Sequence, residues 1–167
     1  MPDPAVTRSF ADHVATHSVA LQRYAYLVCR HPEDAQDIVQ DVLAAAFPKW
    51  GRIMRGNPDA YLRRAIVNAH ISGWRRRRRA MTAVDQAGSP PASEPGVAVD
   101  ERVWARRLCS QLPTRQRAAV ILRVYEDFSF AQTGEVLSCT EAYARTLVSR
   151  GLATLKAHLN SENEDMP

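Results

Sequence analysis

Residues 57–79 read NPDAYLRRAIVNAHISGWRRRRR, and this stretch predicts a long amphipathic helix. Asn57 is a typical helix cap, and Pro58 suits a first turn, where an amide N–H needs no helical partner. Apolar and small side chains then recur at the spacing of one helical face, namely Tyr61, Leu62, Ala65, Ile66, Ala69 and His70. We therefore expect this face to be buried.

The rest of this helix is strongly basic. Arg63, Arg64 and Asn68 are assigned to the other face, and Trp74 is followed by five arginines, Arg75, Arg76, Arg77, Arg78 and Arg79. Fixed positive charge beside an aromatic ring and an amide suits a phosphate backbone with bases that stack or accept hydrogen bonds. The alternative is a solvated helix end, where the helix dipole favours cations.

The composition narrows the class of protein. A chain of 167 residues with 46% hydrophobic content can bury a core, as one domain or two small ones. Its net charge of +4 favours an acidic partner. The sequence shows neither a signal-peptide pattern nor an apolar run long enough for a bilayer, so we expect a cytoplasmic protein without membrane insertion.

The cysteines and two histidines suggest no cofactor. Cys29, Cys109 and Cys139 are an odd number without a CxxC pair, and we expect small buried apolar side chains rather than disulfides or zinc ligands. His13 and His17 stand four residues apart, a spacing that suits a metal ion. With no third ligand nearby in the sequence, solvated histidines are favoured, and we expect no metal.

Two helices are expected before the basic one, from about Arg8 to Cys29 and from Pro32 up to Pro48. The second has a stripe of apolar residues, Ile38, Val39, Val42, Leu43, Ala46 and Phe47, opposite an acidic and amide face, Asp37, Gln40 and Asp41. That acidic face suits a basic protein groove, or only water. The three helices should pack together around Leu27, Leu43, Ile53, Leu62 and Ile66.

A second helical unit is expected after a linker. Residues 80–98 are rich in Ala, Ser, Pro and Gly, which predicts a flexible linker. A helix over 99–112 follows, with Val103, Trp104, Leu108 and Leu112 on its apolar side. Another begins at Pro113 or Thr114 and carries a core-like cluster of Ala119, Val120, Leu122 and Val124.

A helix-turn-helix is predicted next. Ser129 should cap a short helix that ends near Leu137, and Thr140 should cap a longer helix to about Leu159. Polar and aromatic residues lie off the apolar side of the longer helix, namely Tyr143, Arg145, Thr146, Ser149 and Arg150. This arrangement suits a reader of duplex DNA. For Tyr143 and Trp74 the alternative is core packing.

These blocks together resemble a known family. HPEDAQDIVQDVLAAAFPKW, the 57–79 helix, and LPTRQRAAVILRVYEDFSFAQTGEVLSCTEAYARTLVSRGLATLK resemble bacterial RNA polymerase sigma factors of the extracytoplasmic-function group, actinobacterial type. The resemblance implies an all-α protein. It would have a sigma-two domain of three or four bundled helices (1–79), a flexible linker (80–98), a sigma-four helix-turn-helix domain (99–160) and an acidic tail (161–167).

The resemblance also implies roles for particular residues. Asp37, Gln40 and Asp41 would dock on the clamp helices of the polymerase beta-prime subunit, and the sigma-four domain would meet the beta flap. The minus-ten element would be opened and held by Arg63, Arg64, Asn68, Trp74, Arg75, Arg76, Arg77, Arg78 and Arg79, with Asn68 taking an extruded base. The minus-thirty-five element would be read by Thr140, Tyr143, Arg145, Thr146, Ser149 and Arg150. An anti-sigma factor is an implied partner.

Two other classes of protein compete with this interpretation. An autonomous helix-turn-helix regulator would bind promoter DNA tightly without polymerase. An enzyme acting on nucleic acid would need clustered carboxylates or histidines for metal-assisted hydrolysis, whereas the acids here are spread over one helix face. We therefore expect no catalytic residue and no cofactor.

Overall fold

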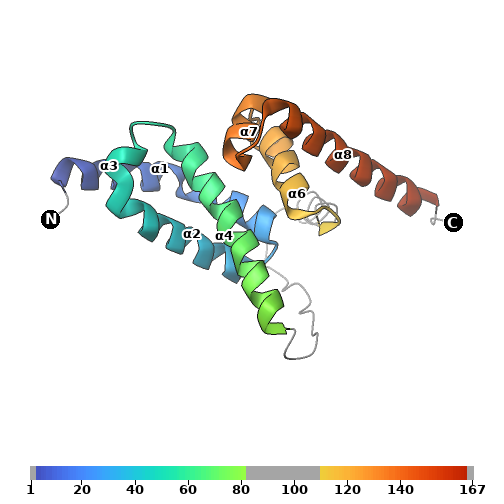
Figure 1. Cartoon of the computed structure of the whole chain (residues 1–167), viewed down its shortest axis with the longest axis horizontal. Helices are drawn as coiled ribbons and strands as arrows, with labels where there is room; N and C mark the ends of the chain where they lie inside the picture. The colour runs from blue at the N-terminus through green and yellow to red at the C-terminus, as the bar shows by residue number, and fades with distance from the viewer. Residues whose placement is uncertain (1–2, 82–109, 165–167) are drawn as a thin grey trace. The chain divides into compact units, whose positions relative to one another are not determined.

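The computed structural model describes residues 3–81 and 110–164, with side chains for 3–73 and 110–161. The chain divides into two compact units, one ending at Pro91 and the other beginning at Ala92. The described ranges contain helices and turns but no strand, which confirms the predicted all-α class (Figure 1). The linker was expected over 80–98, but helix α4 (Pro58–Met81) continues to Met81, so the first two residues of that expected linker are helical. The remainder of the linker, 82–98, and the part of the next expected helix over 99–109 lie outside the described residues. None of the helices found in the described part is sufficiently long and apolar to cross a bilayer.

The first unit is built from long helices joined by short turns. In chain order they are α1 (Pro4–Cys29), α2 (Pro32–Ala46), a 3₁₀ turn (Phe47–Lys49), α3 (Trp50–Ile53) and α4 (Pro58–Met81). Helix α1 begins earlier than expected because Asp3 caps it, its Oδ1 accepting the Ala5 N–H at 2.9 Å. Pro48 lies in the 3₁₀ turn, so α2 ends before Trp50 as predicted.

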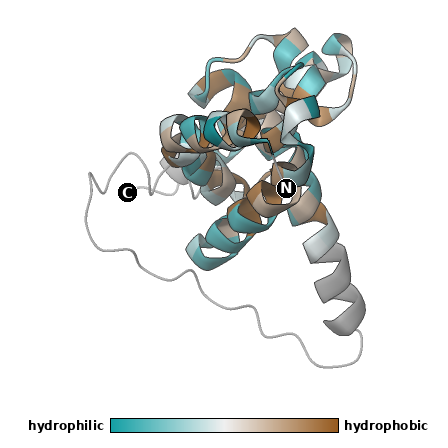
Figure 2. Ribbon diagram, turned by 90° about the vertical axis from the view of Figure 1, so that its left-hand side faces the viewer, coloured by the Kyte–Doolittle hydropathy of each residue, from teal (hydrophilic) through white to brown (hydrophobic). Residues whose placement is uncertain are grey.

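The core of the first unit lies where α4 meets α1 and α2. Leu62 and Ile66 are fully buried, and Leu27 and Ile53 are buried as predicted, whereas Leu43 is only half-buried. Trp50 is 1% exposed, and its Nε1 donates to Ser9 Oγ at 3.3 Å. Figure 2 shows that the helices carry both hydrophobic and hydrophilic residues along their length. The core therefore forms from the apolar stripes of amphipathic helices.

The second unit packs a helix-turn-helix onto a preceding helix. Its described elements are α6 (Thr114–Val120), a π-helical turn (Ile121–Tyr125), α7 (Phe130–Leu137) and α8 (Glu141–Glu164). Both α6 and α7 contact α8. The buried apolar residues are Leu112, Ala118, Ala119, Val120, Ile121, Leu122, Val136, Leu137, Ala144, Leu147 and Val148.

The prediction that Val124 belongs to this core is wrong, since its side chain is 63% exposed. The expected cluster assumed regular α-helical spacing through Tyr125. Instead, the Glu126 N–H donates to the Ile121 carbonyl five residues earlier, at 3.0 Å. The wider turn changes the angle between successive side chains, so Val124 leaves the buried stripe while Leu122 stays in it.

The tight turn between α7 and α8 depends on Gly134. Ser138 adopts the left-handed region (φ 54°), and the Cys139 N–H donates to the Gly134 carbonyl at 2.9 Å. The returning chain passes so close that a Cβ on Gly134 would lie 2.7 Å from the Cys139 carbonyl oxygen. Backbone rather than a movable side chain occupies that space, so only glycine fits without a shift.

We expect Gly134→Ala to destabilise the second unit by about 1–3 kcal/mol, because the new methyl group forces the turn outward. In an open helix interior the same change would stabilise by about 1 kcal/mol. Gly51→Ala is the matched control, since a Cβ there meets only Val6 Cγ2 at an ordinary 3.7 Å. Thermal unfolding followed by circular dichroism measures both. Equal midpoints for the two variants would contradict the steric account.

Candidate nucleic-acid interface

Helix α2 presents an exposed acidic and amide face. Asp37, Gln40 and Asp41 are all exposed, on the side opposite the buried Val39 and Val42. The two aspartates are one turn apart and so share a face. Within residues 3–73 and 110–161, neither carboxylate makes an ion pair, so this face is available to a positively charged partner.

The start of α4 is well defined, and it sets which side chains face outward. Asn57 Oδ1 accepts the Ala60 N–H at 3.1 Å, which confirms the predicted cap. The stripe facing α1 and α2 includes Leu62, Ile66 and Val67. Asn68 is exposed and Arg64 is half-buried. Asn68 therefore offers a free amide on the surface of a rigid helix.

Arg63 does not lie on the exposed face, and the prediction that placed it there is wrong. Its side chain is 3% exposed, its Nη1 lies 2.5 Å from Asp59 Oδ1, and its guanidinium lies 5.6 Å from the centre of the Tyr24 ring. A buried charge needs such partners to offset lost hydration. The sequence pattern placed Arg63 on the exposed face because arginine is polar. In the structure, Asp59 and Tyr24 instead form a buried site for it between α1 and α4.

The tryptophan and arginine run stays on the same helix. Helical backbone continues through Met81, so residues 74–79 extend α4 without a break. The side chains of Trp74, Arg75, Arg76, Arg77, Arg78 and Arg79 lie outside the described residues. Their proposed contacts with DNA stay predictions.

The beginning of α8 is an exposed, mostly polar surface. Thr140 Oγ1 accepts the Tyr143 N–H at 3.1 Å, so its side chain caps the helix as predicted. Tyr143 is 45% exposed, which excludes the alternative of full core packing within this unit. Ser149 and Arg150 are exposed. Thr146 is half-buried, and its hydroxyl donates a hydrogen bond to the Ala142 carbonyl at 3.2 Å. A helix with this start and this face can enter a major groove.

Arg145 is held in place by residues that the sequence did not single out. Its Nη2 lies 2.7 Å from Glu141 Oε1, one turn earlier on α8. Its guanidinium also lies 4.3 Å from the centre of the Phe130 ring, which Arg123 approaches at 5.0 Å. Phe130, at the start of α7, thus orients a cation of α8. The Glu141 spacing was visible in the sequence, but the Phe130 contact needed the fold.

Two family descriptions match separate parts of the chain. Sigma-70 region 2 matches residues 13–80, which cover most of α1 through to nearly the end of α4. Sigma-70 region 4 matches residues 102–155, which include the helix-turn-helix. The acidic face of α2 and the exposed face of α4 fall in the first match, and the polar face of α8 falls in the second.

Curated relatives match along nearly the whole chain. The RNA polymerase sigma-E factor of Streptomyces coelicolor is 29% identical over 157 residues, which span 93% of this chain and 89% of the relative. The ECF RNA polymerase sigma factor SigM of Mycobacterium tuberculosis is 30% identical over 149 residues, 87% of this chain and 76% of the relative. This chain belongs to the ECF RNA polymerase sigma factors.

Solved structures of other sigma factors share the fold. The sigma factor RpoE of Bartonella quintana, solved in complex with the anti-sigma factor NepR, superposes with a TM-score of 0.75 at 24% identity over 92% of this chain and 98% of that one. CnrH, solved in complex with the cytosolic domain of CnrY, gives a TM-score of 0.64 at 24% identity over 93% of this chain and 90% of that one. The predicted pair of sigma-two and sigma-four folds is therefore confirmed.

Membership of this family settles the general function. Sigma factors are non-enzymatic initiation factors of transcription, so this sigma factor directs RNA polymerase and catalyses no reaction of its own. The family assignment does not favour the autonomous regulator.

We expect Arg63→Ala to lower the stability of the sigma-two unit by about 2 kcal/mol, because Asp59 loses its ion pair and the buried site is left unfilled. The matched control is Arg55→Ala, an exposed arginine of the loop before α4, with an expected change within about 0.5 kcal/mol. Thermal unfolding of both variants measures the difference. An unchanged midpoint for Arg63→Ala would show that the buried ion pair contributes little.

Proposed function

We propose that this sigma factor binds core RNA polymerase, brings it to specific promoters and promotes DNA opening through three separate surfaces. The observation that supports this most is the presence of region 2 and region 4 in order on one chain, with polar faces exposed on α2, α4 and α8. We assign 1–81 to the sigma-two domain, because α4 runs to Met81, and 82–98 to a flexible linker. We assign 99–160 to the sigma-four domain and 161–167 to an acidic tail.

The acidic face of α2 is proposed as the polymerase-docking surface. Asp37, Gln40 and Asp41 would meet the clamp helices of the beta-prime subunit, and the sigma-four domain would meet the beta flap. Exposed carboxylates without ion-pair partners among the described residues favour association with a basic groove and repel DNA phosphates. A protein partner is therefore favoured on this face.

Helix α4 is proposed to hold the opened minus-ten element. Opening a duplex costs unstacking energy of a few kcal/mol, which is offset when an extruded base is captured by hydrogen bonds. Asn68 is exposed and carries both a donor and an acceptor, so it suits that capture. We assign Arg64 and the arginines from Arg75 to Arg79 to phosphates and Trp74 to the strand junction, whereas buried Arg63 holds the helix in position.

Helix α8 is proposed to read the minus-thirty-five element. Its first turns carry the exposed Tyr143, Arg145, Ser149 and Arg150, with Thr146 beside them and Thr140 at the cap. Arginine recognises guanine edges and phosphates through paired N–H groups. Because Glu141 and Phe130 restrain Arg145, less side-chain freedom is lost when it contacts a base.

An anti-sigma factor is the proposed regulatory partner. The Bartonella sigma factor with the same fold was solved in complex with one. A protein that covers the surfaces of α2 or α8 would block polymerase or promoter binding. We place this activity in the cytoplasm, where the polymerase and the chromosome meet.

Transcription in vitro tests the function. The purified full chain with core RNA polymerase should yield discrete transcripts from chromosomal fragments, and it should shift promoter DNA on a gel only when core is present. Asp37→Asn with Asp41→Asn should raise the concentration of core needed for half-maximal transcription, because the docking face loses two charges. Asp12→Lys on α1 changes the net charge equally and is the control. A tight shift without core would favour the autonomous regulator.

We expect Asn68→Ala to reduce open-complex formation about tenfold or more while leaving affinity for core unchanged, because only base capture is lost. Permanganate footprinting measures opening, and a pull-down measures core binding. Asn160→Ala, the same chemical change at an exposed position near the end of α8, is the control. Equal losses in opening and in core affinity would contradict the base-capture role.

A further inference from the structure

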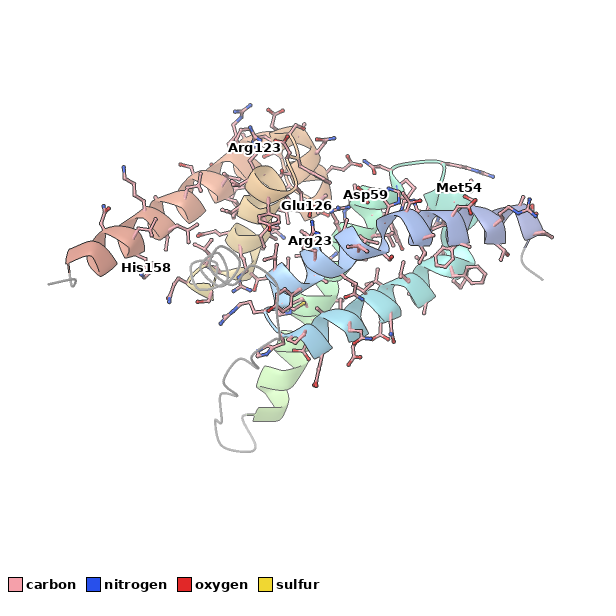
Figure 3. All side chains as sticks on the ribbon, turned by 180° about the vertical axis from the view of Figure 1, so that it is seen from behind. Arg23, Met54, Asp59, Arg123, Glu126 and His158 are labelled. Carbon is pink, nitrogen blue, oxygen red and sulfur yellow. The ribbon has the colours of Figure 1, made fainter. Side chains whose placement is uncertain are left out.

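The fold adds a third metal-ligating side chain to the histidine pair of α1. His13 and His17 are one turn apart, and Asp59, in the first turn of α4, lies beside them. One ligand atom from each of the three lies within 4.8 Å of the others. Figure 3 labels Asp59 near the start of α4. The sequence separates Asp59 from His17 by 42 residues, so only the packing of α4 on α1 brings them together.

Each imidazole has one ring nitrogen that could bind a metal ion. His17 Nδ1 lies 3.0 Å from the His13 carbonyl oxygen, which can only accept, so Nδ1 carries the proton and Nε2 keeps its lone pair. His13 Nε2 is buried without a hydrogen-bond partner in the described structure. A buried polar nitrogen without a partner is unfavourable, and a bound cation would satisfy it.

Neighbouring rings hold the two histidines in place. The rings of His13 and His17 stack at 4.1 Å between centres with 17° between their planes, and Trp50 packs against His13 at 5.0 Å. These contacts restrict the rotation of both imidazoles, so their ring nitrogens are held beside Asp59.

Asp59 can serve as a ligand without leaving Arg63. Its Oδ1 pairs with the Arg63 guanidinium, and a carboxylate has a second oxygen. Arg63 would then act as the outer partner that orients a ligating carboxylate. The same side chains that position α4 thus complete a set of two nitrogens and one oxygen.

We propose that His13, His17 and Asp59 bind a divalent transition-metal ion of the zinc class, which links α1 to the first turn of α4. Two imidazoles and one carboxylate suit zinc, cobalt or nickel, whereas magnesium and calcium prefer oxygen ligands to imidazole. Ligand atoms of a tetrahedral site lie about 3.4 Å apart, so side-chain rotation must close the widest pair by at most about 1.4 Å. The fourth position stays open to water.

Binding at this place would act on the helix proposed to open DNA. The ion would bind the folded sigma-two unit and not the unfolded chain, so it would raise the unfolding temperature in proportion to the logarithm of its free concentration. It would also fix the first turn of α4, nine residues before Asn68. The metal site itself does not depend on the assigned role of Asn68.

Metal titration of the purified full chain tests the proposal. Zinc chloride should bind one site with micromolar or tighter affinity by calorimetry and raise the unfolding midpoint. His17→Ala and Asp59→Asn should each weaken binding at least tenfold, as should His13→Gln. His158→Ala, a histidine of α8 outside the cluster, should bind as the parent does. Circular dichroism confirms that each variant is folded.

Cobalt(II) distinguishes this site from the cysteines, which are the competing zinc ligands. The parent should show the visible absorption of four-coordinate cobalt without a thiolate charge-transfer band in the near ultraviolet, and His17→Ala should lose the visible band. His17 is half-buried and outside the buried core, so this variant should stay folded. Absence of zinc binding by the parent, unchanged binding by the variants, or a thiolate band would each overturn the proposal.

Discussion

The packing of α4 against α1 and α2 is the constraint on which the first unit depends. Leu62 and Ile66 are fully buried in that contact, and each contributes about 1.5–3 kcal/mol of apolar burial. Because a helix is rigid, the buried stripe also determines which side chains face outward. Asn68 is exposed for that reason, and Arg63 is enclosed for the same reason. A slip of one residue would turn every side chain of α4 by about 100° and change which of them are buried.

The same contact explains why polar residues of one helix have different roles. Arg63 and Arg64 are adjacent in the chain, yet a step of about 100° around the helix separates them. Arg63 points into a site made by Asp59 and Tyr24, where it stabilises the junction of α4 and α1. Arg64, by contrast, is only half-buried. Positive charge in this region therefore stabilises the fold and also belongs to the surface that we propose contacts DNA.

In the second unit, the close approach of two backbone segments at a glycine determines how the helices pack. The turn after α7 passes Gly134 so tightly that α8 leaves at a defined angle, and Arg115 Nη2 fastens the end of α7 by donating to the Leu137 carbonyl at 2.7 Å. Phe130 then lies beside Arg145 of α8. A helix that we propose reads DNA would benefit from this restraint, since fewer conformations would be lost on binding.

The sequence by itself determined the helical class, the helix starts at Pro32, Asn57, Ser129 and Thr140, and the acidic face of α2. These features follow from local rules, namely capping, proline placement and the 3.6-residue period. Only the tertiary structure decided that Arg63 is buried, that Val124 is exposed and that Asp59 joins His13 and His17. The environment of Arg63 and the position of Asp59 depend on residues distant in the chain, and the exposure of Val124 depends on a local change from α-helix to π-helix. A sequence pattern that assumes a regular α-helix predicts neither effect.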